Sequence, residues 1–86
     1  MRWLKDVDGF INFDLVDAFS VEEEEDGVYM AAAYFNDRHS TFGPKFSEYD
    51  EAIQWLLHTI PMIIGSFNHG ELVVDVNDPG FGQWTK

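Results

Sequence analysis

Carboxylates are the most abundant side chains in this sequence that could bind a partner or take part in chemistry. The chain of 86 residues has 16 Asp and Glu against 5 Lys and Arg, for a formal net charge of −11. No Lys or Arg interrupts the acids between Lys5 and Arg38, and the run Glu22–Asp26 is five acids in succession. Such a charge repels DNA, RNA and anionic membranes, so the sequence predicts that it binds neither nucleic acid nor membrane directly.

Fixed carboxylates on a folded surface can imitate the phosphates of a nucleic acid and pair with the Lys and Arg of a basic protein. An exposed aromatic side chain could anchor such a complex. The sequence therefore predicts a non-enzymatic module that binds a basic protein, for example a nucleic-acid-binding protein. The predicted binding residues are Asp14, Asp17, Glu22, Glu23, Glu24, Glu25, Asp26, Asp37 and Trp84.

A second interpretation stays open, in which the acids only keep an aromatic-rich chain soluble and protect its strand edges. The protein would then be a small structural or regulatory domain that self-associates as a homodimer. Salt separates the two interpretations, because screening weakens a charge-driven complex and leaves an apolar interface intact.

Other kinds of chemistry find little support. Asp75–Gly80 begins like a calcium loop, but Pro79 stands at the fifth position and Lys86 at the twelfth, which excludes an EF-hand. The histidines are not in metal-ligand spacing, and there is no Cys for a disulfide, a thiol nucleophile or a thiolate ligand. We therefore expect no enzymatic activity, cofactor or specific metal site, and the acidic run leaves only loose divalent-ion binding open.

The N-terminal half of the chain has the sequence pattern of strands. Apolar and polar residues alternate from Phe10 to about Glu24, with a change of phase that predicts a bend near Asp14–Asp17. Asp26-Gly27 predicts a hairpin turn into a strand over Val28–Phe35, whose alanines would let a helix pack closely. After a turn we expect a short strand from Ser40 to about Phe42, ended or distorted by Gly43-Pro44.

One helix and one more strand complete the pattern. We expect Ser47 to cap a helix that buries Ala52, Ile53, Leu56, Leu57 and Ile60, with Pro61 ending or kinking it. Glu71–Val76 predicts the last strand. The sequence thus predicts one small α+β domain over residues 1–86: an antiparallel sheet of four to five strands with one main helix packed on one face.

Aromatic residues at strand and helix spacings are expected in the core. Trp3 is expected to fold back onto the sheet, and the place of Trp84 is left open between the core and an interface. The residues assigned to the core are Phe10, Phe13, Phe19, Phe35, Phe42, Phe46 and Trp55.

Turns and patterning over residues 10–60 resemble those of small uncharacterised strand-rich proteins with a C-terminal helix from Gram-positive bacteria and their phages. The matching segments are Ile11–Val16, Asp26-Gly27, Tyr34–Asp37, Phe46-Ser47 and Asp50–Ala52. The resemblance implies the fold and a phage or mobile-element setting, and it carries no functional residues across. In that setting the predicted binding module would be an inhibitor that blocks a basic nucleic-acid-binding protein. With no signal-like apolar run after Met1-Arg2, we expect a cytoplasmic location.

Overall fold

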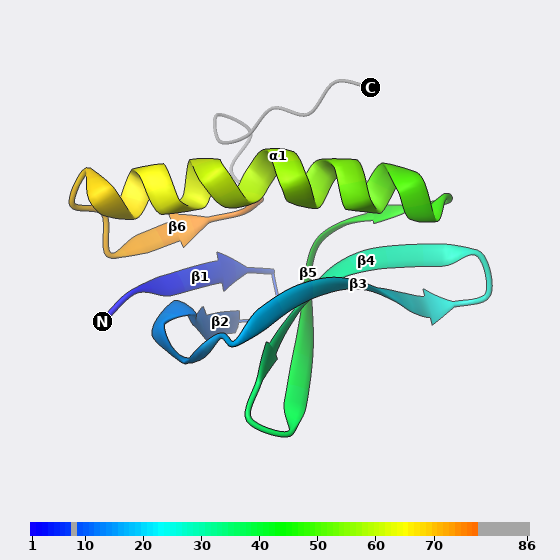
Figure 1. Ribbon diagram of the computed structural model, residues 1–86, viewed down its shortest axis with the longest axis horizontal. Helices are drawn as coiled ribbons and strands as arrows, with labels where there is room; N and C mark the ends of the chain where they lie inside the picture. Colours follow the sequence, from blue (N-terminus) through cyan, green and yellow to red (C-terminus); the bar gives the residue numbers. More distant parts are fainter. Residues whose placement is uncertain (8, 78–86) are drawn as a thin grey trace.

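The computed structural model describes residues 1–7 and 9–77, and it confirms an α+β fold with one α-helix (Figure 1). The elements follow in the order β1 (Trp3–Asp6), β2 (Gly9–Asn12), a 3-10 turn η1 (Phe13–Leu15), β3 (Ala18–Glu25), β4 (Val28–Phe35), β5 (Arg38–Phe46), α1 (Tyr49–Asn68) and β6 (Val73–Asp75).

The described strands form two three-stranded sheets, so the prediction of a single antiparallel sheet was wrong. One sheet has the order β2-β1-β6, with β1 antiparallel to β2 and parallel to β6. The other is the antiparallel meander β3-β4-β5. The error has a physical cause: β1 is only four residues long and includes Lys5 and Asp6, so it lacks the alternation that marks a strand in sequence.

The predicted bend is the place where the chain passes from one sheet to the other. The Asn12 side chain accepts a hydrogen bond from the Asp14 N–H at 3.0 Å and so caps η1. The Phe13 N–H donates to the Arg2 carbonyl, which fastens the turn to the start of β1. The stretch from Phe10 to Glu24 is therefore two strands of different sheets, and the turn separates them.

The meander follows the predicted turns closely. Gly27 has φ +76°, as expected for the β3–β4 hairpin, and the alanines of β4 are fully buried. β5 is longer than predicted, because Gly43-Pro44 distorts the strand without ending it. Its pairing with β4 shifts register there, and Gly43 has φ +84°. A bulge at this point lets Phe46 still pair with Tyr29, next to the start of α1.

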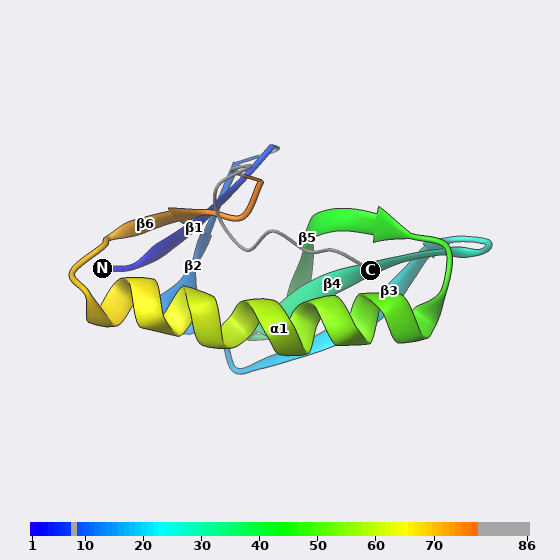
Figure 2. The ribbon, with the colours of Figure 1, turned by 90° about the horizontal axis from the view of Figure 1, so that it is seen from above.

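Helix α1 lies across both sheets, with β3, β4 and β5 along its first half and β6, β1 and β2 along its second (Figure 2). It runs through Pro61 to Asn68, so the proline does not end it. Pro61 is exposed, and water can hydrogen bond to the carbonyl that lacks a helical N–H partner. The prediction that Ser47 caps the helix was also wrong. Glu48 is the N-cap residue, and the Ser47 hydroxyl donates to the Glu51 carboxylate at 3.4 Å.

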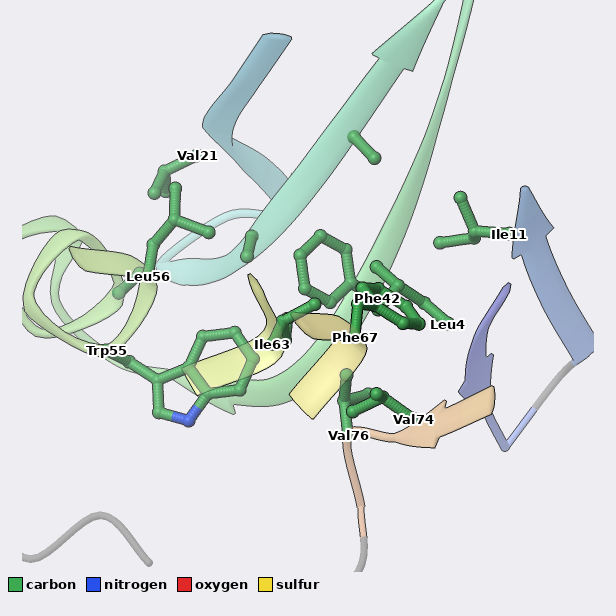
Figure 3. Packing of buried hydrophobic residues seen from close by; sticks show 13 residues of the cluster. Leu4, Ile11, Val21, Phe42, Trp55, Leu56, Ile63, Phe67, Val74 and Val76 are labelled. Carbon is green, nitrogen blue, oxygen red and sulfur yellow. The ribbon is translucent and has the colours of Figure 1, made fainter. Parts of the chain in front are cut away.

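One continuous core joins the helix to both sheets (Figure 3). The helix contributes a stripe that differs from the predicted one at Leu57, which is 70% exposed, whereas Trp55 is buried as predicted. Phe10, expected in the core, is 61% exposed, whereas Trp3 is half-buried and packs edge-to-face on it with ring centroids 6.4 Å apart. The buried helical residues are Ala52, Trp55, Leu56, Thr59, Ile63 and Phe67.

Among the described residues, no helix is long and apolar enough to cross a membrane.

Candidate protein-binding surface

The β3–β4 hairpin carries the acidic run at its tip. Glu22 is half-buried on β3, and the residues from Glu23 to Asp26 are exposed. A register shift between Glu23 and Glu25 interrupts the regular pairing with β4. The run therefore projects from the end of a two-stranded ribbon, where its charges face solvent.

The start of α1 brings a second group of acids to the same end of the molecule. Tyr29 of β4 stacks edge-to-face on Tyr49, the first residue of α1, with ring centroids 5.9 Å apart. Both ribbon views show the hairpin tip and the N-terminus of α1 at one end (Figures 1 and 2). We call this combined surface the acidic pole. Its members are Glu22, Glu23, Glu24, Glu25, Asp26, Glu48, Asp50 and Glu51.

Three of these acids were missed as site residues. In the sequence Glu48, Asp50 and Glu51 are explained by the positive end of the helix dipole, and about twenty residues separate them from Asp26. Two long-range contacts, the pairing of Phe46 with Tyr29 and the stacking of Tyr49 on Tyr29, show that the helix begins beside the hairpin. That pairing depends on the bulge at Gly43, which the sequence signals as a distortion without giving its direction.

The negative charge of the acidic pole changes the pKa of Tyr29, which lies beside the acids on β4. The negative charge of Glu23 raises the pKa of the Tyr29 hydroxyl above its ordinary value of 10.0, and burial, a hydrogen bond with Glu23 and the charge of Asp26 add to the effect. The Glu23 carboxylate also accepts a hydrogen bond from the Gly27 N–H at 3.2 Å. The Thr41 hydroxyl donates to Glu24 at 2.6 Å, so two of the acids are held in place.

The acids of the hairpin tip form no ion pair with the described Lys and Arg side chains. The ion pairs found between described Lys or Arg side chains and carboxylates are Arg2–Asp14 at 2.7 Å and Lys5–Asp75 at 3.8 Å. Neither includes a residue of the run Glu22–Asp26, whose charges are thus not neutralised within the described part of the chain. Lys45 on β5 is the basic residue nearest in sequence to the start of α1.

The other predicted acids lie elsewhere. Asp17 precedes β3 and accepts a hydrogen bond from the Asn36 N–H at 3.3 Å, and Asp37 is in the β4–β5 turn. An eight-residue strand such as β4 spans roughly 25 Å, so these residues are at the far end of the meander from the hairpin tip. The structure therefore divides the predicted binding set into two locations.

Asp14 has a partner within the chain. Its carboxylate accepts hydrogen bonds from the Arg2 N–H at 2.9 Å and from the Arg2 Nε at 2.7 Å. The backbone hydrogen bond, followed by that of the guanidinium, lowers the pKa of Asp14 below its ordinary value of 3.8. This ion pair ties the N-terminus to η1, so the role that the structure gives to Asp14 is local.

Some predicted features cannot be placed or form no site. Trp84 and the end of the calcium-like loop, residues 78–80, lie outside the described residues. At the start of that loop the Asp75 carboxylate accepts a hydrogen bond from the Asn77 N–H and pairs with Lys5. Within residues 1–7 and 9–77, no cluster of three or more His, Cys, Asp or Glu side chains is arranged to hold a metal ion.

Comparison of the chain with family models, with curated proteins and with solved structures finds no match. The resemblance noted for residues 10–60 accordingly stays a prediction.

Proposed function

We propose that this protein is a non-enzymatic module that binds a basic surface of another protein through the acidic pole. The observation that carries the proposal is the meeting of two acidic segments, distant in sequence, at one end of the fold. A concentration of like charge opposes folding by self-repulsion, so its retention favours a partner that supplies the opposite charge.

The acidic pole also has an exposed aromatic side chain among its charges, as many protein interfaces do. Tyr49 is 49% exposed and lies among the acids, with its ring held against Tyr29. Tyrosines are common anchors at interfaces, because a rigid ring buries much area at little entropic cost. A partner would cover Tyr49 and surround it with Lys and Arg side chains that pair with the carboxylates.

The mechanism that we propose is competition with nucleic acid. Carboxylates of the pole would occupy Lys and Arg side chains that otherwise hold phosphates, and long-range attraction would speed association. The partner is then a nucleic-acid-binding protein that this chain inhibits, in keeping with the phage or mobile-element setting predicted from the sequence.

A salt-stepped affinity experiment tests this proposal. The immobilised protein is exposed to a lysate of the source or host cell and eluted with rising salt. The expected result is release of a basic protein at moderate salt. When this protein is added, the purified partner should release a bound, labelled DNA or RNA duplex, and fluorescence anisotropy measures that release.

A matched pair of variants makes the test specific to the pole. Glu25→Gln with Asp26→Asn removes two charges from the hairpin tip, and Asp37→Asn with Glu71→Gln removes two from exposed positions elsewhere. We expect the first variant to lose affinity by roughly tenfold or more, equivalent to about 1.4 kcal/mol, and the second to lose much less. Equal losses, or a complex that resists 1 M salt, would contradict the proposal.

Self-association is the second candidate function, and the outer face of α1 favours it. Leu57 and Ile64 are exposed at positions i and i+7, with Pro61 between them. A dimer through this apolar face would persist in high salt, and light scattering after size exclusion would detect it. Leu57→Glu should then produce a monomer. A monomer for the unaltered chain at all salt concentrations would exclude this candidate.

A further inference from the structure

A groove of about 490 Å³ lies between the two sheets, away from the acidic pole. One wall comes from β1, β2 and η1, and the other comes from the end of β4 and the start of β5. The lining residues that matter here are Trp3, Phe10, Leu15, Phe35 and Arg38.

The walls of this groove present large apolar side chains to solvent. Phe10 is 61% exposed and Leu15 is 54% exposed, although the chain has a core in which such residues could be buried. Trp3 packs edge-to-face on Phe10 and holds its ring in place. Grouped, exposed apolar side chains in a concave surface mark a place where a ligand or a partner binds.

Arg38 supplies a cation beside these apolar walls. Its guanidinium lies over the Phe35 ring, with the central carbon 5.6 Å from the ring centroid. In the described part of this acidic chain, Arg38 makes no ion pair and no side-chain hydrogen bond. Stacking uses the face of a guanidinium and leaves its N–H edge able to donate two hydrogen bonds to a carboxylate.

The groove also borders two strand edges. Among the described strands, β2 pairs only with β1, and β5 pairs only with β4. Residues 10–12 of β2 and 38–40 of β5 all line the groove. An exposed strand edge binds an extended peptide through main-chain hydrogen bonds, and neighbouring side-chain pockets give the specificity.

We propose that this groove binds an extended peptide segment of a partner protein, with a large apolar side chain against Phe10 and Phe35 and one carboxylate on Arg38. The flanks of that segment are neutral or basic, because the net charge of −11 repels a peptide with several acids. A single acid next to an aromatic or aliphatic residue is therefore the expected recognition motif.

This site is separate from the acidic pole. Phe35 and Tyr29 are six residues apart on β4, a distance of roughly 20 Å along a strand. Neutralising the hairpin acids should leave the groove intact, and altering the groove should leave the pole intact. The two proposals can thus fail independently.

Selection from a displayed library of random eight-residue peptides, with the whole protein as bait, tests the groove. The expected peptides contain one Asp or Glu beside a large apolar residue. Arg38→Gln should lower the affinity for a synthetic copy of the selected peptide at least tenfold. Lys45→Gln removes the same charge from the same strand outside the groove and should have little effect on this affinity. Phe10→Ser should also weaken binding, with Leu57→Ser as its exposed apolar control.

Amide hydrogen exchange supplies a readout that charge alone would not change. Bound peptide should slow the exchange of backbone amides in β2 or β5 as main-chain hydrogen bonds form. Failure to enrich any peptide, enrichment of peptides without an acid, or equal binding by Arg38→Gln and the unaltered protein would each overturn the proposal.

Discussion

Gly43→Ala tests what constrains the bulge of β5, after which Phe46 pairs with Tyr29 beside the start of α1. Gly43 lies in the bulge of β5, with φ +84°, a conformation that costs an alanine about 1–2 kcal/mol. A Cβ atom there would lie 2.9 Å from Cζ3 and 3.0 Å from Cζ2 of Trp55, and closer still to Cη2. Forcing an atom into such a contact typically costs about 1–3 kcal/mol more.

Both terms act on the same substitution, so Gly43→Ala should lower the free energy of unfolding by about 2–5 kcal/mol. Gly27→Ala is the matched control, because Gly27 has φ +76° and a Cβ atom added there would meet no atom within 4 Å. The free energy of unfolding of Gly27→Ala should fall only by the conformational cost, about 1–2 kcal/mol. The difference between the two variants then measures the contact with Trp55.

Urea unfolding followed by circular dichroism gives both free energies, provided that the slope with denaturant stays constant. For a domain of this size, 1 kcal/mol corresponds to a melting temperature change of about 4–8 °C. If Gly43→Ala costs no more than Gly27→Ala, the Trp55 ring does not constrain the bulge and the reasoning fails. A double-mutant cycle with Trp55→Leu should show positive coupling between the two positions.

Three further predictions concern a buried hydroxyl, an ion pair and the charges of the hairpin tip. The Thr59 hydroxyl is buried and has no hydrogen-bond partner among the described residues, so Thr59→Val should raise the free energy of unfolding by about 1 kcal/mol in thermal or urea melts, and a destabilised variant would contradict this. The pKa of Asp14 is lowered in the folded protein, so its stabilising effect is present above the ordinary value of 3.8 and is lost as pH falls through the folded pKa. Asp14→Asn should therefore lower the melting temperature at pH 7, and this loss should shrink as pH falls below 3.8. A difference independent of pH would refute the ion pair with Arg2. Glu25→Gln with Asp26→Asn should stabilise the isolated protein at low salt, by up to about 0.5 kcal/mol, and this gain should vanish at 1 M NaCl.

Local features of the fold could be predicted, because each depends on residues close in sequence. Asp26-Gly27 defined the hairpin through the backbone freedom of Gly27, and the phase change near Asp14 placed the bend. The helix start was located to within a residue or two, although Ser47 does not cap it. Such signals act over a few residues and need no knowledge of the tertiary structure.

The division into two sheets could not be predicted, because it rests on long-range pairing. β1 pairs in parallel with β6, and almost the whole described chain lies between these strands. The exposure of Phe10 has the same origin: its alternation with Ile11 is typical of a strand, but which of the two faces the core depends on where α1 lies. For the same reason, the sequence predicted the hairpin acids of the acidic pole but not the helix acids. Only the tertiary structure brings the acids of the helix beside those of the hairpin.

The two halves of the pole differ in what they cost the fold. Asp50 and Glu51 occupy the first turn of α1, where the positive end of the helix dipole favours negative charge, so their presence has a structural explanation. The run Glu22–Asp26 has no such compensation: it lies at the end of a ribbon and makes no ion pair with a described Lys or Arg. Solubility alone would be served equally well by acids spread over the surface. The uncompensated hairpin acids are therefore the part of the pole that argues most strongly for a basic partner, and Tyr49 stands beside them at the start of the helix.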